Sequence, residues 1–275
     1  DVCTLIYTSG TTGNPKGVMH TPSTLGSFVR THFTMTGRDR DLVGILWFPL
    51  AHIGGICAFG MGPVVNGTRA VFLEQFDPEA ALDLIEREQV TNAGGPTPIV
   101  QALLAAKGFA PQRVRSIRQS GLGATDVPPE LIRELRAKLG AFVSRSYGMT
   151  ECPMATGGTP QDPEEKLVTT DGRAVPGVTV RTVDDAGRAV AAGAEGELFG
   201  PQLCVGYTDA RLSAEAFTAD GFLRSGDLAV KDAGGFVRIT GRKKDIIIRK
   251  GENLSAKAIE DELYDHPKIA DVAVI

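Results

Sequence analysis

Hydrophobic residues in the first two-thirds of the chain form short apolar runs separated by longer stretches of mixed polarity. The runs are rich in β-branched residues and are bounded by Gly, Pro or Thr, which is typical of buried strands. The strands predicted in this way are Val2–Tyr7, Leu42–Phe48, Val71–Leu73, Ser116–Gln119 and Ala141–Ser144.

Two of the intervening stretches have apolar residues at helical spacing. Pro78–Glu88 carries Leu82 and Ile85 on one face, and Pro128–Leu139 carries leucines at i, i+4 and i+8. Both begin with a proline, which is favoured in the first helical turn. Alternation of strands and helices predicts an α/β fold of layered, mostly parallel sheets with helices.

The pattern changes at about Thr169. Short alternating segments such as Val178–Val183 and Gly196–Phe199 are separated by Asp- and Gly-rich turns, which predicts a small antiparallel β-barrel-like subdomain. A charged run, Gly241–Asp245, then precedes Ile246–Ile248 and indicates a hinge. We therefore expect an α/β region over 1–168, a β-rich subdomain over 169–241, and the hinge and start of a C-terminal lobe over 242–275.

The segment Leu42–Thr68 contains no charged residue, so a membrane span is an alternative for it. Pro49, Pro63, His52 and six glycines interrupt this segment and disfavour an unbroken helix in lipid. A buried strand, a turn at Pro49 and a core helix after His52 fit the pattern better.

Composition narrows the function classes. The 275 residues include 29 Lys and Arg against 33 Asp and Glu, and no basic run is present, which argues against a nucleic-acid partner. The four cysteines form no Cys-x-x-Cys pair and the four histidines have no metal-ligand spacing, so we expect reduced thiols and a cytoplasmic protein. Because the chain starts without Met and stops within an apolar run, we expect it to be the central fragment of a longer protein.

The densest chemical signal is the segment Tyr7–Gly17, which follows the first predicted strand. It contains three glycines, four Ser and Thr hydroxyls and the ammonium of Lys16. Glycines let a backbone approach a polyanion closely, and N–H groups, hydroxyls and an ammonium together can bind phosphates. The glycine spacing differs from that of a Walker A loop, and a solvated turn is the alternative.

This loop and four later segments resemble the AMP-forming adenylating superfamily, which includes acyl-CoA synthetases, 4-coumarate–CoA ligases and beetle luciferases. The match to the signature loop is complete over Tyr7–Gly17. The later segments are Ser146–Glu151, Arg224–Leu228, Gly241–Asp245 and Lys250–Asn253. They follow in the order typical of the superfamily, and the resemblance covers essentially the whole chain.

The resemblance implies an ATP site, and the side chains suit it. Tyr147 offers a flat face to a purine, Asp227 and Arg242 suit the ribose hydroxyls, and Glu151 is an oxygen ligand for Mg²⁺. Charged members of this set could instead form surface ion pairs. The full set expected to bind ATP or AMP is Thr8, Ser9, Gly10, Thr11, Thr12, Gly13, Lys16, Gly123, Ala124, Tyr147, Gly148, Thr150, Asp227 and Arg242. The residues expected to act in catalysis are Lys16, Thr150, Glu151 and Lys250, with Asp245 as the hinge.

An acid-binding pocket is implied at His52, Gly123 and Ala124. The segment that follows Ala124 departs from the superfamily pattern, because Asp126 stands where relatives usually have proline. His52 lies in an apolar segment, and a core position is an equal alternative for it. No acidic residue occurs in Trp47–Ile56 to pair with a substrate ammonium, so the substrate is expected to be an apolar fatty or aryl acid.

The implied reaction uses ATP and Mg²⁺ to make an acyl adenylate and then CoA to make a thioester. Two alternatives stay open: a non-catalytic nucleotide-binding protein, and an adenylating enzyme with an acceptor other than CoA. Because relatives carry a further catalytic lysine in the C-terminal lobe, we expect this chain alone to adenylate poorly.

Overall fold

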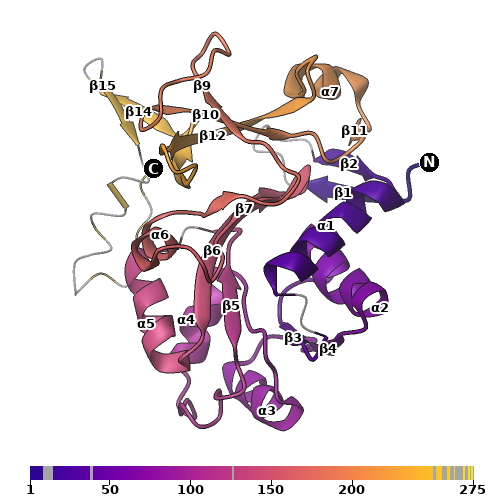
Figure 1. Cartoon of the computed structure of the whole chain (residues 1–275), viewed down its shortest axis with the longest axis vertical. Coiled ribbons are helices and arrows are strands. Elements are labelled where there is room, and N and C mark those ends of the chain that lie inside the picture. Colours follow the sequence, from indigo (N-terminus) through magenta and orange to yellow (C-terminus); the bar gives the residue numbers. More distant parts are fainter. Residues whose placement is uncertain are drawn as a thin grey trace.

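The computed structural model describes residues 1–8, 15–37, 40–125, 127–249, 252–255, 259, 260, 263, 269, 272 and 274. For 246–249 and 252–255 it describes the backbone only. Most helices and the parallel strands lie in one half of the molecule, and most of the antiparallel strands lie in the other half (Figure 1). The predicted α/β class is confirmed.

A mixed sheet runs through the helical half. Strand β3 (Val43–Leu46) pairs in parallel with β4 (Arg69–Phe72), and β5 (Gln119–Leu122) pairs in parallel with β6 (Phe142–Met149). Asn92 joins the two pairs through parallel bridges to both Gly44 and Gln119. The antiparallel strands β7 (Cys152–Gly157) and β8 (Arg173–Ala174) extend the sheet beyond β6.

The prediction of a strand over 116–119 is wrong in its boundaries, because β5 begins only at Gln119. Val114 and Ile117 are both buried in the core, although they lie in the turns before β5. The apolar residues needed for burial made this segment resemble a strand in sequence, whereas the backbone hydrogen bonds place the strand later.

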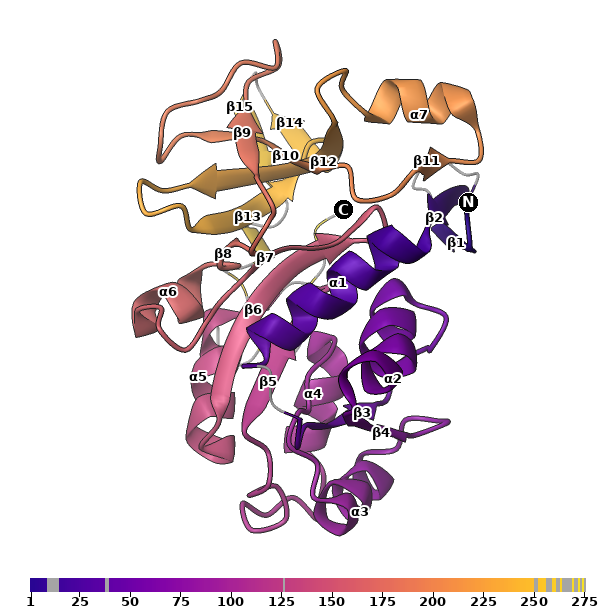
Figure 2. The same ribbon diagram turned by 45° about the vertical axis from the view of Figure 1, so that its right-hand side comes forward.

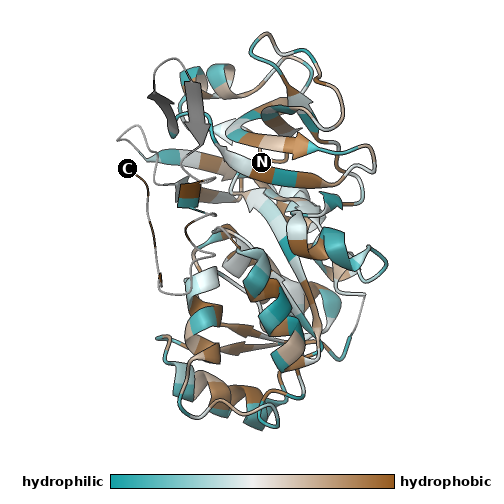
Figure 3. Ribbon diagram, turned by 90° about the vertical axis from the view of Figure 1, so that its left-hand side faces the viewer, coloured by the Kyte–Doolittle hydropathy of each residue, from teal (hydrophilic) through white to brown (hydrophobic). Residues whose placement is uncertain are grey.

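Three helices pack on this sheet: α3 (Pro78–Glu88), α4 (Thr97–Leu104) and α5 (Pro129–Leu139). The Asp77 side chain accepts a hydrogen bond from Ala80 N at 2.8 Å, which caps the start of α3. Leu82, Ile85 and Leu135 are completely buried in the core between these helices and the sheet. The two predicted helices, α3 and α5, are therefore confirmed. Figure 3 shows hydrophobic strands enclosed by helices with hydrophilic outer faces.

The uncharged segment forms β3, a turn and two helical turns, η1 (Gly55–Met61) and α2 (Gly62–Asn66). These helical turns pack against α1 (Pro22–Met35), which the sequence pattern did not predict. Among the described residues, every helix is too short or too polar to cross a bilayer.

The other half contains a four-stranded antiparallel sheet in the order β13-β12-β10-β9. The antiparallel β-structure expected after Thr169 is therefore present, and within the described residues its sheet is open. The predicted strand over 178–183 begins only at Arg181, because Val178 lies in a turn that bonds back to Val175. The bounds are β9 (Arg181–Val183), β10 (Glu195–Pro201), β12 (Phe222–Lys231) and β13 (Val237–Arg242), with α6 (Glu164–Thr169) before them.

A third sheet joins the N-terminal hairpin to a short strand from the second half of the chain. Strands β1 (Thr4–Thr8) and β2 (Lys16–His20) form a hairpin, and β11 (Gly206–Tyr207) pairs with β2. Figure 2 shows β11, followed by α7 (Ala210–Ala216), beside this hairpin. A last hairpin is formed by β14 (Ile246–Arg249) and β15 (Glu252–Ser255), directly after the charged run Gly241–Asp245.

Candidate functional site

Three side chains from two sheets meet at one end of the candidate site. The Tyr147 hydroxyl donates a hydrogen bond to Asp227 Oδ2 at 2.5 Å, and Arg242 Nε lies 3.1 Å from Asp227 Oδ1. The antiparallel register of β12 and β13 pairs Asp227 with Arg242 directly. The sequence predicted these three residues as one group, and the structure brings them together.

Asp227 is 4% exposed, and its burial is the main cause that raises the pKa of its carboxyl group. The hydrogen bond from Tyr147 and the charges of Arg242 and Lys244 act in the opposite direction. Burial first, and then the charge of Asp227, raise the pKa of Tyr147 well above its ordinary value. The phenol therefore remains protonated and can donate to the carboxylate.

A cavity of about 360 Å³ lies beside this group. Its walls combine aromatic, glycine and charged residues, as a nucleoside site requires. They include Ala124, Tyr147, Gly148, Asp227, Arg242 and Asp245. Four sequence motifs thus contribute to one hollow, which we call the polar cavity.

Two glycines beside this cavity are required by backbone packing. A Cβ atom at Gly148 would lie 2.3 Å from the carbonyl oxygen of Pro153, and one at Gly123 would lie 2.8 Å from that of Ser146. Ala124 has a φ of +65°, a left-handed conformation that is unusual for a residue with a side chain. Its strained backbone lies at the wall shared with the neighbouring cavity.

The signature loop connects β1 to β2, whose register pairs Thr8 with Lys16. Thr8, the last residue of β1, and Lys16, the first residue of β2, therefore flank the loop. The expected phosphate-binding residues Ser9, Gly10, Thr11, Thr12 and Gly13 lie outside the described residues, as does Lys250.

Lys16 and Glu151 are linked through a tyrosine that the sequence analysis missed. The Lys16 ammonium lies 5.3 Å from the centre of the Tyr207 ring, and the Tyr207 hydroxyl donates to Glu151 Oε1 at 2.5 Å. No local pattern marked Tyr207, because it becomes a neighbour of Glu151 only when β11 pairs with β2.

Glu151 suits a divalent cation. Its carboxylate is 8% exposed, and its second oxygen, Oε2, accepts no hydrogen bond from the described residues. The described residues hold no cluster of three or more acidic, His or Cys side chains for a metal. A single carboxylate is sufficient for Mg²⁺ when phosphates and water complete its six ligands.

Thr150 is positioned by a buried histidine that the sequence analysis also missed. His20 Nε2 lies 2.9 Å from the Thr150 carbonyl oxygen, and Nδ1 lies 3.1 Å from Thr24 Oγ1. Since a carbonyl oxygen can only accept, Nε2 carries the proton. Burial lowers the pKa of His20, against the effects of Thr150 and the Glu151 charge, so the ring is neutral.

A second cavity, of about 510 Å³, adjoins the first and shares Ala124 and Gly148 with it. We call it the apolar cavity, because Phe28, Phe48 and Phe59 line it. All three residues expected in the acid-binding pocket, His52, Gly123 and Ala124, also line it.

His52 is exposed overall and contributes to the wall of the apolar cavity, so it does not occupy the core position that was its alternative. Its Nδ1 accepts a hydrogen bond from Gly54 N at 3.2 Å, and its ring lies edge-on to Phe48 at 6.0 Å. Burial lowers the pKa of His52.

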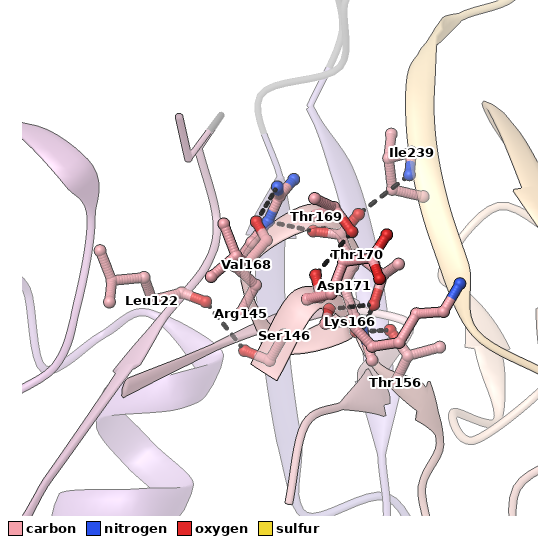
Figure 4. Close-up of polar contacts among 12 residues, drawn as sticks. Leu122, Arg145, Ser146, Thr156, Lys166, Val168, Thr169, Thr170, Asp171 and Ile239 are labelled. Atoms are coloured by element: carbon pink, nitrogen blue, oxygen red, sulfur yellow. Dashed lines mark hydrogen bonds and ion pairs between the residues drawn. The ribbon is translucent and has the colours of Figure 1, made fainter. Parts of the chain in front are cut away.

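A buried ion pair, whose polar contacts Figure 4 shows, is part of the lining of the polar cavity. Arg145 Nε lies 3.1 Å from Asp171 Oδ1, and both side chains are less than a tenth exposed. Asp171 Oδ2 also accepts from Ile239 N at 2.9 Å, and its carbonyl accepts from Thr156 Oγ1 at 2.6 Å. Asp171 therefore joins β6 and β13 through its carboxylate and β7 through its backbone carbonyl.

Comparison with known proteins finds relatives that include acid–CoA ligases. The medium-chain fatty-acid–CoA ligase of Escherichia coli K12 is 36% identical over 278 residues, which cover all of this chain and 49% of that protein. The indoleacetate–CoA ligase of Aromatoleum aromaticum is 34% identical, over 98% of this chain and 53% of that protein. The chain thus spans about half the length of the curated relatives it matches.

Solved structures agree with this result. ATP-bound MatB from Rhodopseudomonas palustris has a TM-score of 0.93 and 31% identity, over all of this chain and 55% of that one. An o-succinylbenzoate–CoA synthetase from Bacillus subtilis, in complex with ATP and magnesium, has a TM-score of 0.88 and 30% identity, over 98% of this chain and 56% of that one. Residues 1–208 also match the sequence profile of the family described as AMP-binding enzyme. The chain belongs to the AMP-binding enzyme family.

Proposed function

We propose that this chain forms the nucleotide- and acid-binding part of an AMP-forming acid–CoA ligase. The observation that carries the proposal is the pair of adjoining cavities. The polar cavity has the Tyr147–Asp227–Arg242 group at its wall, and the apolar cavity meets it at Ala124 and Gly148. An acid in one and a nucleotide in the other would place a carboxylate beside an α-phosphate.

In the first half-reaction a carboxylate oxygen attacks the α-phosphorus of ATP in line. The bond to the bridging oxygen of the β-phosphate breaks, so that acyl-AMP forms and pyrophosphate leaves. Lys16 and the amides of the signature loop would stabilise the developing charge, since phosphoryl-type transfer depends mainly on positioning and electrostatics. Mg²⁺, held by Glu151 and the phosphates, would supply further positive charge.

In the second half-reaction the CoA thiolate attacks the acyl carbon and AMP leaves with its phosphate oxygen. We propose that residues 242–275 begin a lobe that turns about Asp245 between the two steps, with Lys250 reaching the site afterwards. In the same proposal, 1–168 and 169–241 are the two regions that hold the substrates. We place this reaction in the cytoplasm, where the four free cysteines would stay reduced.

The substrate is proposed to be an apolar fatty or aryl acid. The lining of the apolar cavity includes no aspartate or glutamate among the described residues, so a substrate ammonium would lack a partner there. The named relatives act on a medium-chain fatty acid and on indoleacetate, which supports an apolar acid of moderate size.

The test uses the natural full-length protein and the variant Glu151→Ala. Calorimetry should detect ATP binding that strengthens with Mg²⁺, and Glu151→Ala should remove most of that Mg²⁺ effect, about 10-fold or more. Glu130→Ala, which removes an exposed carboxylate on α5, is the control and should bind as the wild type does.

Activity separates the alternatives. Pyrophosphate release that depends on an added fatty or aryl acid would contradict the alternative of a non-catalytic nucleotide-binding protein. Thioester formation with CoA would contradict the alternative of an acceptor other than CoA. Binding of Mg·ATP without acid-dependent pyrophosphate release would contradict the ligase assignment. The present chain by itself is expected to exchange pyrophosphate only weakly.

A further inference from the structure

Tyr207 touches both charged residues that the proposed function places at the phosphates. Its hydroxyl donates to Glu151 Oε1 at 2.5 Å, and its ring face lies 5.3 Å from the Lys16 ammonium. Aromatic rings attract cations over their faces, whereas their hydroxyls donate in the ring plane. One side chain can therefore hold a cation and an anion at two separate positions.

The position of Tyr207 is set by three independent contacts. The pairing of β11 with β2 places it opposite Val18, and its backbone N donates to Ser213 Oγ at 2.8 Å. The ring of Phe217 packs against it with centres 5.7 Å apart. The backbone and the ring of Tyr207 are therefore both fixed by contacts within the protein.

The hydroxyl of Tyr207 is the donor in its bond to Glu151, because a carboxylate oxygen can only accept. A phenol that donates to a carboxylate fixes its orientation without neutralising its charge. Glu151 can therefore bind a cation through Oε2, which accepts no hydrogen bond from the described residues.

The ring also separates two opposite charges. Among the described residues, Lys16 and Glu151 form no direct ion pair, and the Tyr207 side chain contacts both. A direct pair would occupy the carboxylate that a divalent cation needs and the ammonium that a phosphate needs.

We propose that Tyr207 is a positioning residue, which orients Glu151 for a divalent cation and holds Lys16 apart from it for the phosphates. This inference deepens the proposed function and rests on it. Its effects are expected on cation and triphosphate binding, and not on the nucleoside end of the site, where Tyr147 and Asp227 lie.

The experiment measures nucleotide binding by the full-length protein with Tyr207→Phe, Tyr207→Leu and Glu151→Gln. Tyr207→Phe removes only the hydroxyl, so the Mg²⁺ concentration that half-saturates the strengthening of ATP binding should rise about 10-fold. Affinity for ATP in EDTA should change less than about twofold. Tyr207→Leu also removes the ring and should weaken ATP binding in EDTA several-fold.

Binding of AMP, measured with every variant, reports whether the nucleoside site is still folded, and it should be unchanged. In the Glu151→Gln background, adding Tyr207→Phe should cause no further loss of Mg²⁺ sensitivity, because the hydroxyl acts through the carboxylate.

The two proposals fail in different ways. If Glu151→Gln raises the Mg²⁺ midpoint and Tyr207→Phe does not, the positioning role is overturned and the proposed function stands. If the Mg²⁺ midpoint of the double variant rises by the product of the two single effects, the two residues act independently. The positioning role of Tyr207 is then also overturned. If Glu151→Gln has no effect, the cation does not bind at Glu151 and the proposed function loses its metal site.

Discussion

Gly148 lies where two parts of the backbone approach too closely for any side chain. A Cβ atom there would lie 2.3 Å from Pro153 O and 3.1 Å from Cys152 O, and backbone atoms cannot turn away as flexible side chains do. The sequence analysis places this glycine among the residues expected to bind ATP or AMP. The structure adds a second requirement, which is the tight turn between β6 and β7.

We expect Gly148→Ala to lower the free energy of unfolding by about 1–3 kcal/mol, as overpacking usually does. It should also weaken AMP binding, since Tyr147 is the preceding residue. Urea unfolding and calorimetry measure the two effects. Gly60→Ala is the matched control, because a Cβ atom there meets nothing closer than 3.8 Å. A Gly148→Ala protein as stable as this control would contradict the close approach.

At the scale of elements, the Arg145–Asp171 pair holds strands from both halves together. Arg145 lies on β6, and Asp171 accepts hydrogen bonds from residues of β7 and β13. A buried pair of this kind adds little stability compared with apolar residues, but removing one partner leaves the other charge unpaired. The contact therefore matters chiefly for the alignment of β6 and β13, which carry Tyr147 and Arg242.

Asp171→Ala is expected to lower the free energy of unfolding by about 3–5 kcal/mol, because the Arg145 guanidinium then stays buried without its partner. Glu130→Ala removes the exposed pair with Arg133 and should change stability by less than about 1 kcal/mol. Urea denaturation curves of the three proteins test this. Equal losses for the two variants would mean that Arg145 finds water or another acceptor.

At the scale of the whole molecule, burial of neutral histidines makes stability depend on pH. Burial lowers the pKa of His32, in the wall of the apolar cavity, to about 4, and it also lowers the pKa of His20 and His52. Below the ordinary pKa of 6.5 the unfolded chain binds protons that the folded chain does not. The contribution of the neutral histidines to the free energy of unfolding is thus complete above pH 6.5 and decreases as the pH falls toward 4.

The free energy of unfolding should therefore fall between pH 7 and pH 4.5 more steeply in the wild type than in His32→Leu, which cannot titrate at this position. Urea denaturation at several pH values measures both slopes, and the comparison cancels the contribution of the carboxylates. Parallel curves would show that His32 is protonated equally in the folded and unfolded states.

Local sequence predicted best the elements that contain both a signal for their first residue and a repeating pattern of apolar residues. The helix α3 has a proline, a capping aspartate and apolar residues at helical spacing, and α5 has a similar pattern. The start of β5 was wrong, because buried turn residues have the same apolar character as strand residues. The alternating pattern after Thr169 predicted antiparallel strands but not whether their sheet closes, because alternation indicates a strand and not which strands pair at the edges.

The chain by itself determined the chemistry of the site, because glycines, hydroxyls, Lys16, Glu151 and Asp227 occur in motifs whose residue types suit phosphates, a cation and a ribose. Only the tertiary structure decided how these groups are held. The hydrogen bond from Tyr207 to Glu151 spans 56 residues, and that from His20 to Thr150 spans 130. Such contacts depend on strand pairing between distant segments, and no local pattern of side chains encodes which strands will become neighbours.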